Sequence, residues 1–178
     1  MTVKANSLQD DAGSRGKMGS DHRSEANVCS DPVFALPEFP LDACRQTVVI
    51  DTNIILDVFV FNDVAAKPVK KALEAGELDW IATQPMRDEL ARVLAYPQIV
   101  PRLAFYQLSA GDVLASFDRH ARLLEVAVKA RLNCSDPDDQ KFIDLAVASQ
   151  TLLLSKDRHV LSMSKRLLAH GVRAQAAI

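Results

Sequence analysis

Acidic residues follow four short apolar segments of this chain, and each segment has the composition of a β-strand. In open parallel sheets, ligands bind outside the carboxyl ends of the strands, so acids in these places are expected to meet in one crevice. Crowded carboxylates repel one another unless some are protonated or a cation neutralises them. Oxygen ligands select hard cations such as Mg²⁺ or Mn²⁺. The four acids are Asp51 after residues 47–50, Glu89 after 79–83, Asp139 after 123–128 and Asp157 after 151–155.

A cation held by carboxylates suits the hydrolysis of phosphodiester bonds. Such an ion lowers the pKa of a bound water, orients it and stabilises the charge that develops on a phosphate. Zinc is not expected, because the sequence contains neither a His-x-x-x-His pair nor paired cysteines. The cysteines, Cys29, Cys44 and Cys134, are odd in number and far apart, and they are interpreted as reduced thiols.

Three of the acids also suit purely structural roles. Asp51 begins an Asp-Thr-Asn sequence typical of turns, although an acid directly after a buried strand needs a partner. Glu89 suits an exposed helix face, where it would pair with Arg87 or Arg92. Asp157 suits the N-cap of the last helix. Taken together, the acids indicate a site more strongly than any one of them does.

The acids that follow the third predicted strand divide between capping and binding roles. Asp136 precedes Pro137, which suits the first position of a helix, so Asp136 is predicted to be the N-cap. Asp138 is then expected to face solvent, and Asp139 is the better candidate for a metal ligand. The choice between Asp138 and Asp139 stays open here. Asp144, further along, is expected to lie on the helix surface.

Strands that alternate with helices must position these acids. Continuous β-branched runs suit strands buried on both faces of a parallel sheet, and the alternation predicts an α/β fold. We expect a three-layer α/β/α domain over residues 45–178, with a central parallel sheet of about four or five strands. The predicted strands are 47–50, 79–83, 123–128 and 151–155, and 172–175 suits a short fifth strand. Residues 54–60 suit a helix or a turn, and the predicted helices are 66–75, 85–96, part of 101–111, 112–120, 135–148 and 160–169.

Composition and charge limit the remaining possibilities. The chain has 178 residues, 48% of them hydrophobic, which is enough for one domain with a sizeable core. Residues 1–44 are rich in Ser, Asp, Asn and Gly and are predicted to be a disordered or loosely docked N-terminal extension. The net charge is only −2, so contacts with nucleic acid must come from local patches. No apolar run is long enough to cross a membrane and no secretory signal is found, so a cytoplasmic location is expected.

Four segments of the chain form a pattern: Val48-Val49-Ile50-Asp51-Thr52-Asn53, Arg87-Asp88-Glu89-Leu90, Asp136-Pro137-Asp138-Asp139-Gln140-Lys141-Phe142 and Leu154-Ser155-Lys156-Asp157. In this order and at this spacing they resemble the PIN domain family, most closely its bacterial branch of toxin components of toxin–antitoxin systems. The most specific pieces are the Asp-Thr-Asn after a β-branched strand and the Asp-Pro-x-Asp-x-x-Phe segment. The resemblance leaves the N-terminal extension unexplained.

This resemblance implies a Mg²⁺- or Mn²⁺-dependent ribonuclease that acts on single-stranded RNA. It also implies a homodimer and an antitoxin protein that blocks the crevice, which we expect to insert an Arg or Lys among the acids. The metal ligands and catalytic residues carry over as Asp51, Glu89, Asp139 and Asp157. The supporting residues are Asn53, Ser155 and Asp136. Near the expected rim lie Lys141, Lys156 and Arg158, which would contact the RNA backbone or else be ordinary solvated charges.

Three other interpretations stay open at this point. A receiver-type phosphoacceptor domain also gathers acids and Mg²⁺ at strand ends, but the strand predicted at 123–128 has no Asp at its end. A non-catalytic scaffold that binds RNA or protein would be favoured by a loss of acids, and all four are present. A DNA-directed nuclease would use the same metal chemistry, because the ions act on the phosphate that RNA and DNA share.

Overall fold

Five parallel strands form the sheet of this computed structural model, which describes residues 45–178. The extension predicted for residues 1–44 lies outside the described residues. The strand order is β3-β2-β1-β4-β5, and the predicted α/β fold with a central parallel sheet is confirmed. The strands are β1 (Gln46–Ile50), β2 (Leu78–Thr83), β3 (Ala121–Leu124), β4 (Leu152–Leu154) and β5 (Arg173–Gln175).

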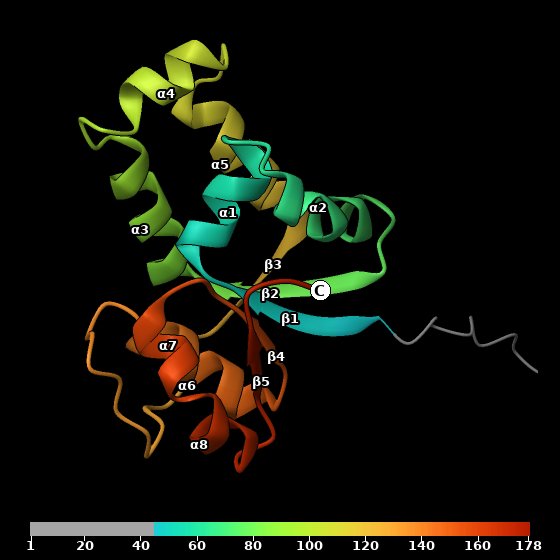
Figure 1. The fold of residues 1–178 in the computed structure, drawn as a ribbon, viewed down its shortest axis with the longest axis vertical. Helices are drawn as coiled ribbons and strands as arrows, with labels where there is room; N and C mark the ends of the chain where they lie inside the picture. Colours follow the sequence, from blue (N-terminus) through green and yellow to red (C-terminus); the bar gives the residue numbers. More distant parts are fainter. Residues whose placement is uncertain (1–44) are drawn as a thin grey trace, which may run out of the picture. The chain divides into compact units, whose positions relative to one another are not determined.

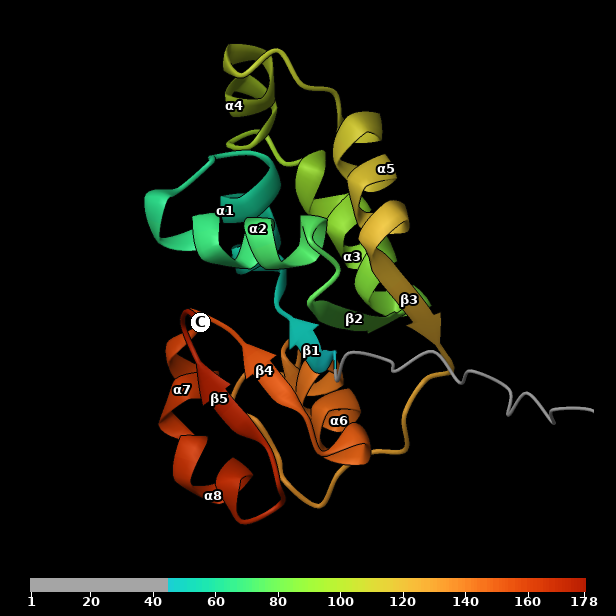
Figure 2. The ribbon, with the colours of Figure 1, turned by 90° about the vertical axis from the view of Figure 1, so that its right-hand side faces the viewer.

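Helices cover both faces of the sheet. They are α1 (Thr52–Phe59), the 3-10 helix η1 (Val64–Ala66), α2 (Lys67–Glu74), α3 (Gln84–Leu94), α4 (Val100–Phe105), α5 (Ala110–His120), α6 (Gln140–Ser149), α7 (Arg158–Ser162) and α8 (Ser164–Leu168). Figures 1 and 2 show α1 to α5 on one side of the strands and α6 to α8 on the other, which confirms the three layers. The helix predicted at 160–169 is divided between α7 and α8. Among the described helices, none is long and apolar enough to span a membrane.

The strand order creates a reversal point at the carboxyl ends of β1 and β4. The chain runs outward from β1 through β2 to β3, and then returns to the other side of β1 to form β4 and β5. The backbone N–H of Asp51, directly after β1, donates a 2.9 Å hydrogen bond to the carbonyl oxygen of Leu154, the last residue of β4. Ligands of open parallel sheets bind at such reversal points. The fold therefore brings the residues after β1 and β4 to one place.

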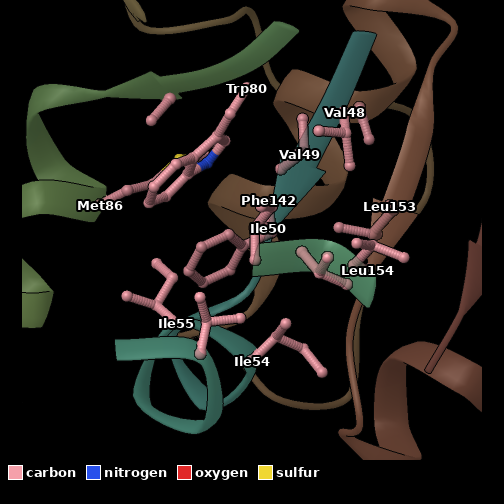
Figure 3. Close-up of a cluster of buried hydrophobic side chains, with 14 of the residues drawn as sticks. Val48, Val49, Ile50, Ile54, Ile55, Trp80, Met86, Phe142, Leu153 and Leu154 are labelled. Atoms are coloured by element: carbon pink, nitrogen blue, oxygen red, sulfur yellow. The ribbon is translucent and has the colours of Figure 1, made fainter. Parts of the chain in front are cut away.

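The last three side chains of β1 lie in the core, as their apolar β-branched sequence predicts. Val48, Val49 and Ile50 are buried. Figure 3 shows them among apolar side chains from several elements, including Ile55 of α1 and Phe142 of α6. Burying each side chain of this size contributes about 1.5–3 kcal/mol to stability. A strand anchored in this way gives a fixed position to the acid that follows it.

The third strand lies further toward the N-terminus than predicted. The pairing of β3 with β2 ends where Leu124 lies opposite Thr83. Helix α3 begins directly after Thr83, so β3 has no strand beside it beyond Leu124. Residues 125–128, which the sequence assigned to this strand, lie outside the sheet.

Helix α6 begins at Gln140, several residues later than predicted, and the prediction that Asp136 is its N-cap is wrong. The carboxylate of Asp136 instead accepts a 2.9 Å hydrogen bond from the N–H of Asp138, which closes a local turn. Pro137 suits this turn as well as a helix start, because its fixed φ angle fits both.

Candidate functional site

Three of the predicted site residues form one hydrogen-bonded chain between the ends of β1 and β4. Asp51 is buried directly after β1, with an exposed fraction of only 2%. The hydroxyl of Ser155 donates a 2.7 Å hydrogen bond to Oδ2 of Asp51. The same Ser155 oxygen accepts a 2.9 Å hydrogen bond from the backbone N–H of Asp157. Ser155 therefore links the positions of the two acids.

Burial dominates the electrostatics of Asp51. Burial raises the pKa of its carboxyl group, the hydrogen bond from Ser155 lowers this pKa in part, and the charge of Glu89 raises it again. The nearby backbone N–H groups of Asn53 and Thr52 also lower the pKa of this carboxyl group. The side chain of Asn53 lies on the exposed side of α1. A buried carboxyl group whose pKa is raised is one that a nearby cation would stabilise in its charged form.

Glu89 reaches the site from α3 and is held by residues of two other helices. The hydroxyl of Thr52 in α1, a partner that the sequence did not predict, donates a 2.9 Å hydrogen bond to Oε1 of Glu89. The ammonium group of Lys141, in the first turn of α6, forms an ion pair with Oε2. Arg87, one of the partners expected for an exposed Glu89, pairs with Asp118. The alternative that Glu89 lies on a solvated helix face is therefore wrong.

Asp139 joins the other acids from the N-cap position of α6. Burial, followed by the charges of Asp51, Asp157 and Asp136, raises the pKa of its carboxyl group to about 7. Its Oδ2 atom is buried and has no hydrogen-bond partner among residues 45–178. Asp138 is exposed. Asp139 is therefore the one of this pair that lies near the other acids.

Asp157 occupies the N-cap of α7 while lying close to the other acids. Its Oδ1 atom accepts a 2.6 Å hydrogen bond from the backbone N–H of His159, so the capping role is present. An ionised carboxylate has two oxygens and about four lone-pair positions. The cap therefore leaves acceptor capacity on Asp157 for a further partner, and the two roles are compatible.

The three basic residues expected at the rim differ in their contacts. Lys141 pairs with an acid of the site, as described above. The Nζ atom of Lys156 lies 2.6 Å from Oδ2 of Asp57 and 3.4 Å from Oδ2 of Asp63. Arg158 is exposed at the first position of α7. Two of the three are thus paired with carboxylates of the chain itself.

Oxygen atoms suited to a hard metal ion gather here, although they are not assembled around one point. All four acids supply oxygen, the donor that Mg²⁺ and Mn²⁺ prefer. The buried Oδ2 of Asp139 has acceptor capacity that the described residues leave unused. Within the described part of the chain, no three acidic, histidine or cysteine side chains are arranged so that they could hold one ion. The residues fit such an ion in their chemistry, and binding would require side chains to rotate.

Two polar residues of α6 hold the loop that precedes this helix, and neither was predicted to do so. The amide of Gln140 donates a 2.8 Å hydrogen bond to the carbonyl oxygen of Leu132 and accepts one of 2.8 Å from the N–H of Cys134. Oδ1 of Asp144 accepts a 2.8 Å hydrogen bond from the N–H of Ala130. The expectation that Asp144 lies on the helix surface is therefore wrong. The sequence signal that could have indicated this role is the i, i+4 spacing of Gln140 and Asp144, which places both side chains on one side of α6.

Comparison with known proteins gives a family and a fold. A family model described as "PIN domain" matches residues 47–159. Among solved structures, VapBC2 from Rickettsia felis, bound to a DNA fragment from their promoter, contains a chain that aligns with a TM-score of 0.50 and 10% sequence identity. This alignment covers 73% of the present chain and 98% of the other. No curated protein matches the sequence. At this identity, the structural likeness shows the fold alone.

Proposed function

Because the chain belongs to the PIN domain family, we propose that it is a Mg²⁺- or Mn²⁺-dependent ribonuclease that hydrolyses phosphodiester bonds in single-stranded RNA. PIN domains are generally nucleases. The observation that carries the proposal is the meeting of acids at the reversal point of the sheet. Asp51 is joined to Asp157 through Ser155, the charge of Glu89 acts on Asp51, and the charges of Asp51 and Asp157 act on Asp139.

In this proposal, each polar residue at the reversal point has a distinct task. The ion would be held by Asp51, Glu89, Asp139 and Asp157. When bound, it supplies a water of lowered pKa and positive charge beside the phosphate. Ser155 favours the charged form of Asp51, because its hydroxyl donates to that carboxylate. Thr52 orients Glu89 in the same way. The backbone N–H of Asn53 lowers the pKa of Asp51, and the charge of Asp136 raises the pKa of Asp139.

Basic side chains at the rim would contact the RNA backbone, as in other proteins that neutralise phosphates. Arg158 is the strongest candidate of the three, because it is exposed next to Asp157. Lys156 is a weaker candidate, because two carboxylates already neutralise it. Lys141 contributes only when it is released from Glu89.

The chain is further proposed to be the toxin component of a toxin–antitoxin pair, acting in the cytoplasm as a homodimer. The support is the shared fold with a chain of VapBC2 and the four motifs that resemble the toxin branch of the family. An antitoxin would inhibit the chain by placing an Arg or Lys among the acids, where a cation offsets their repulsion. A co-purified complex in which the acids remain open to solvent would contradict this part of the proposal.

Cleavage of labelled single-stranded RNA and of DNA of the same sequence, each with Mg²⁺, with Mn²⁺ and with EDTA, tests the function. The proposal predicts that RNA is cut with either metal and that EDTA abolishes cutting. Cutting of DNA alone would favour the DNA-directed alternative. Mn²⁺ binding without cleavage would mean a narrow substrate range. No binding and no cleavage would favour a non-catalytic scaffold.

A further inference from the structure

The ammonium group of Lys141 lies near the acids of the site rather than in open solvent. It forms an ion pair with Oε2 of Glu89 and donates a hydrogen bond to the carbonyl oxygen of Asp138. It also lies 5.0 Å from the centroid of the Phe142 ring, within the distance at which a cation is attracted to an aromatic face. The Lys141 side chain is only 23% exposed. Three contacts thus hold this cation in place.

Neighbouring basic side chains are paired with other acids. Arg87 pairs with Asp118, and Lys156 pairs with Asp57 and Asp63. Among the ion pairs of residues 45–178, the pair formed by Lys141 is the one that includes an acid of the site. Carboxylates that share a crevice without a metal ion repel one another, and an ammonium group beside them reduces that repulsion.

Glu89 is arranged so that the lysine occupies only one of its two oxygens. The hydroxyl of Thr52 holds Oε1 at 2.9 Å, which keeps the carboxylate oriented if Oε2 is released. A metal ion that takes Glu89 as a ligand would therefore compete with Lys141 for Oε2. We propose that Lys141 is a built-in counter-ion of the metal-free site, which a divalent cation must displace from Glu89. This inference rests on the proposed metal dependence, and it adds that the chain limits its own affinity for the metal.

A titration of the full chain with Mn²⁺, followed by the loss of the free-ion signal in electron paramagnetic resonance, tests the inference without measuring cleavage. Lys141→Met removes the charge and keeps much of the side-chain length. Lys141→Arg keeps the charge and the ability to pair with Glu89. Lys165→Met makes the same change as Lys141→Met at an exposed position of α8. Thermal unfolding without metal shows that each variant folds.

The inference predicts that Lys141→Met binds Mn²⁺ about three- to tenfold more tightly than the wild type, as expected on removing a partly buried competing ion pair. Without metal, this variant should melt at a lower temperature, because the acids lose their counter-ion. Lys141→Arg and Lys165→Met should bind Mn²⁺ like the wild type.

Two failures are distinguishable in this experiment. If the wild type binds Mn²⁺ and Lys141→Met binds it equally or less tightly, the inference is overturned and the metal dependence stands. Weaker binding would mean that the lysine prepares Glu89 for the ion instead of competing with it. If the folded wild type binds no Mn²⁺, the metal dependence fails and the inference fails with it.

Discussion

Replacing Asp139 by Asn is expected to remove a pH-dependent loss of stability from the metal-free protein. The carboxyl group of Asp139 has a pKa of about 7 in the folded chain, against an ordinary value of 3.8. Between these two pH values the folded state keeps a proton that the unfolded state has released. A proton bound preferentially by the folded state stabilises it. This stabilisation is therefore lost as the pH rises from 3.8 to about 7. Above the folded pKa both states are ionised, and the contribution stays constant.

The size of the effect follows from the pKa shift and from the exposure of the carboxyl group. A shift from 3.8 to about 7 corresponds to about 4 kcal/mol, at about 1.36 kcal/mol for each pKa unit. Asp139 is only partly buried, so solvent screening reduces the expected effect to about 1–2 kcal/mol.

Urea unfolding in EDTA at about pH 5 and pH 8 measures this effect directly. Because this pH range covers about two thirds of the window, Asp139→Asn should gain about 1 kcal/mol of unfolding free energy relative to the wild type. Asp138→Asn changes the exposed neighbour and should keep the wild-type pH dependence. An identical pH dependence for Asp139→Asn and the wild type would refute the reasoning.

Two further predictions concern the residues that position the site. Ser155→Ala should lower the unfolding free energy by about 1–3 kcal/mol, because Asp51 loses a buried hydrogen bond. Ser116→Ala on α5, where the serine hydroxyl makes an exposed hydrogen bond to the backbone, should change it by less than about 0.5 kcal/mol. Equal losses in a denaturant titration of the two serine variants would contradict this. Asp144→Ala should speed proteolytic cutting within residues 125–139, because the N–H of Ala130 in this loop loses its acceptor. Asp144→Asn should be cut at the wild-type rate, because its amide oxygen can still accept that hydrogen bond. Unchanged cutting of the alanine variant would show that this hydrogen bond does not hold the loop.

The strands and the acids that follow them were predictable because both depend on local sequence. The continuous β-branched run 47–50 suits a strand buried on both faces, and the structure places β1 in the middle of the sheet. Parallel strands end at the same edge, so Asp51 and Asp157 were expected in one crevice. The hydrogen bonds that join each of them to Ser155 are consistent with this expectation.

Contacts between helices were not predictable in the same way. The pairing of Glu89 with Lys141 depends on which faces of α3 and α6 meet, and residue spacing within one helix does not determine this. Local signals were also ambiguous around Pro137, which suits a turn and a helix start equally well. The structure has the turn there. The loop before it is tied to α6 by hydrogen bonds with the side chains of Gln140 and Asp144.

The most direct test of the central claim is a comparison of RNA cleavage by the wild type, Asp51→Asn and Asp79→Asn at saturating Mn²⁺. Asp79 lies near the amino end of β2, away from the crevice, and pairs with Arg122 at the surface. If the acids at the ends of β1 and β4 form the metal-dependent centre, Asp51→Asn should lose cleavage by orders of magnitude, because a charged metal ligand is lost. Asp79→Asn should cut RNA at the wild-type rate. Wild-type cleavage by Asp51→Asn would contradict the assignment of the centre to this end of the sheet.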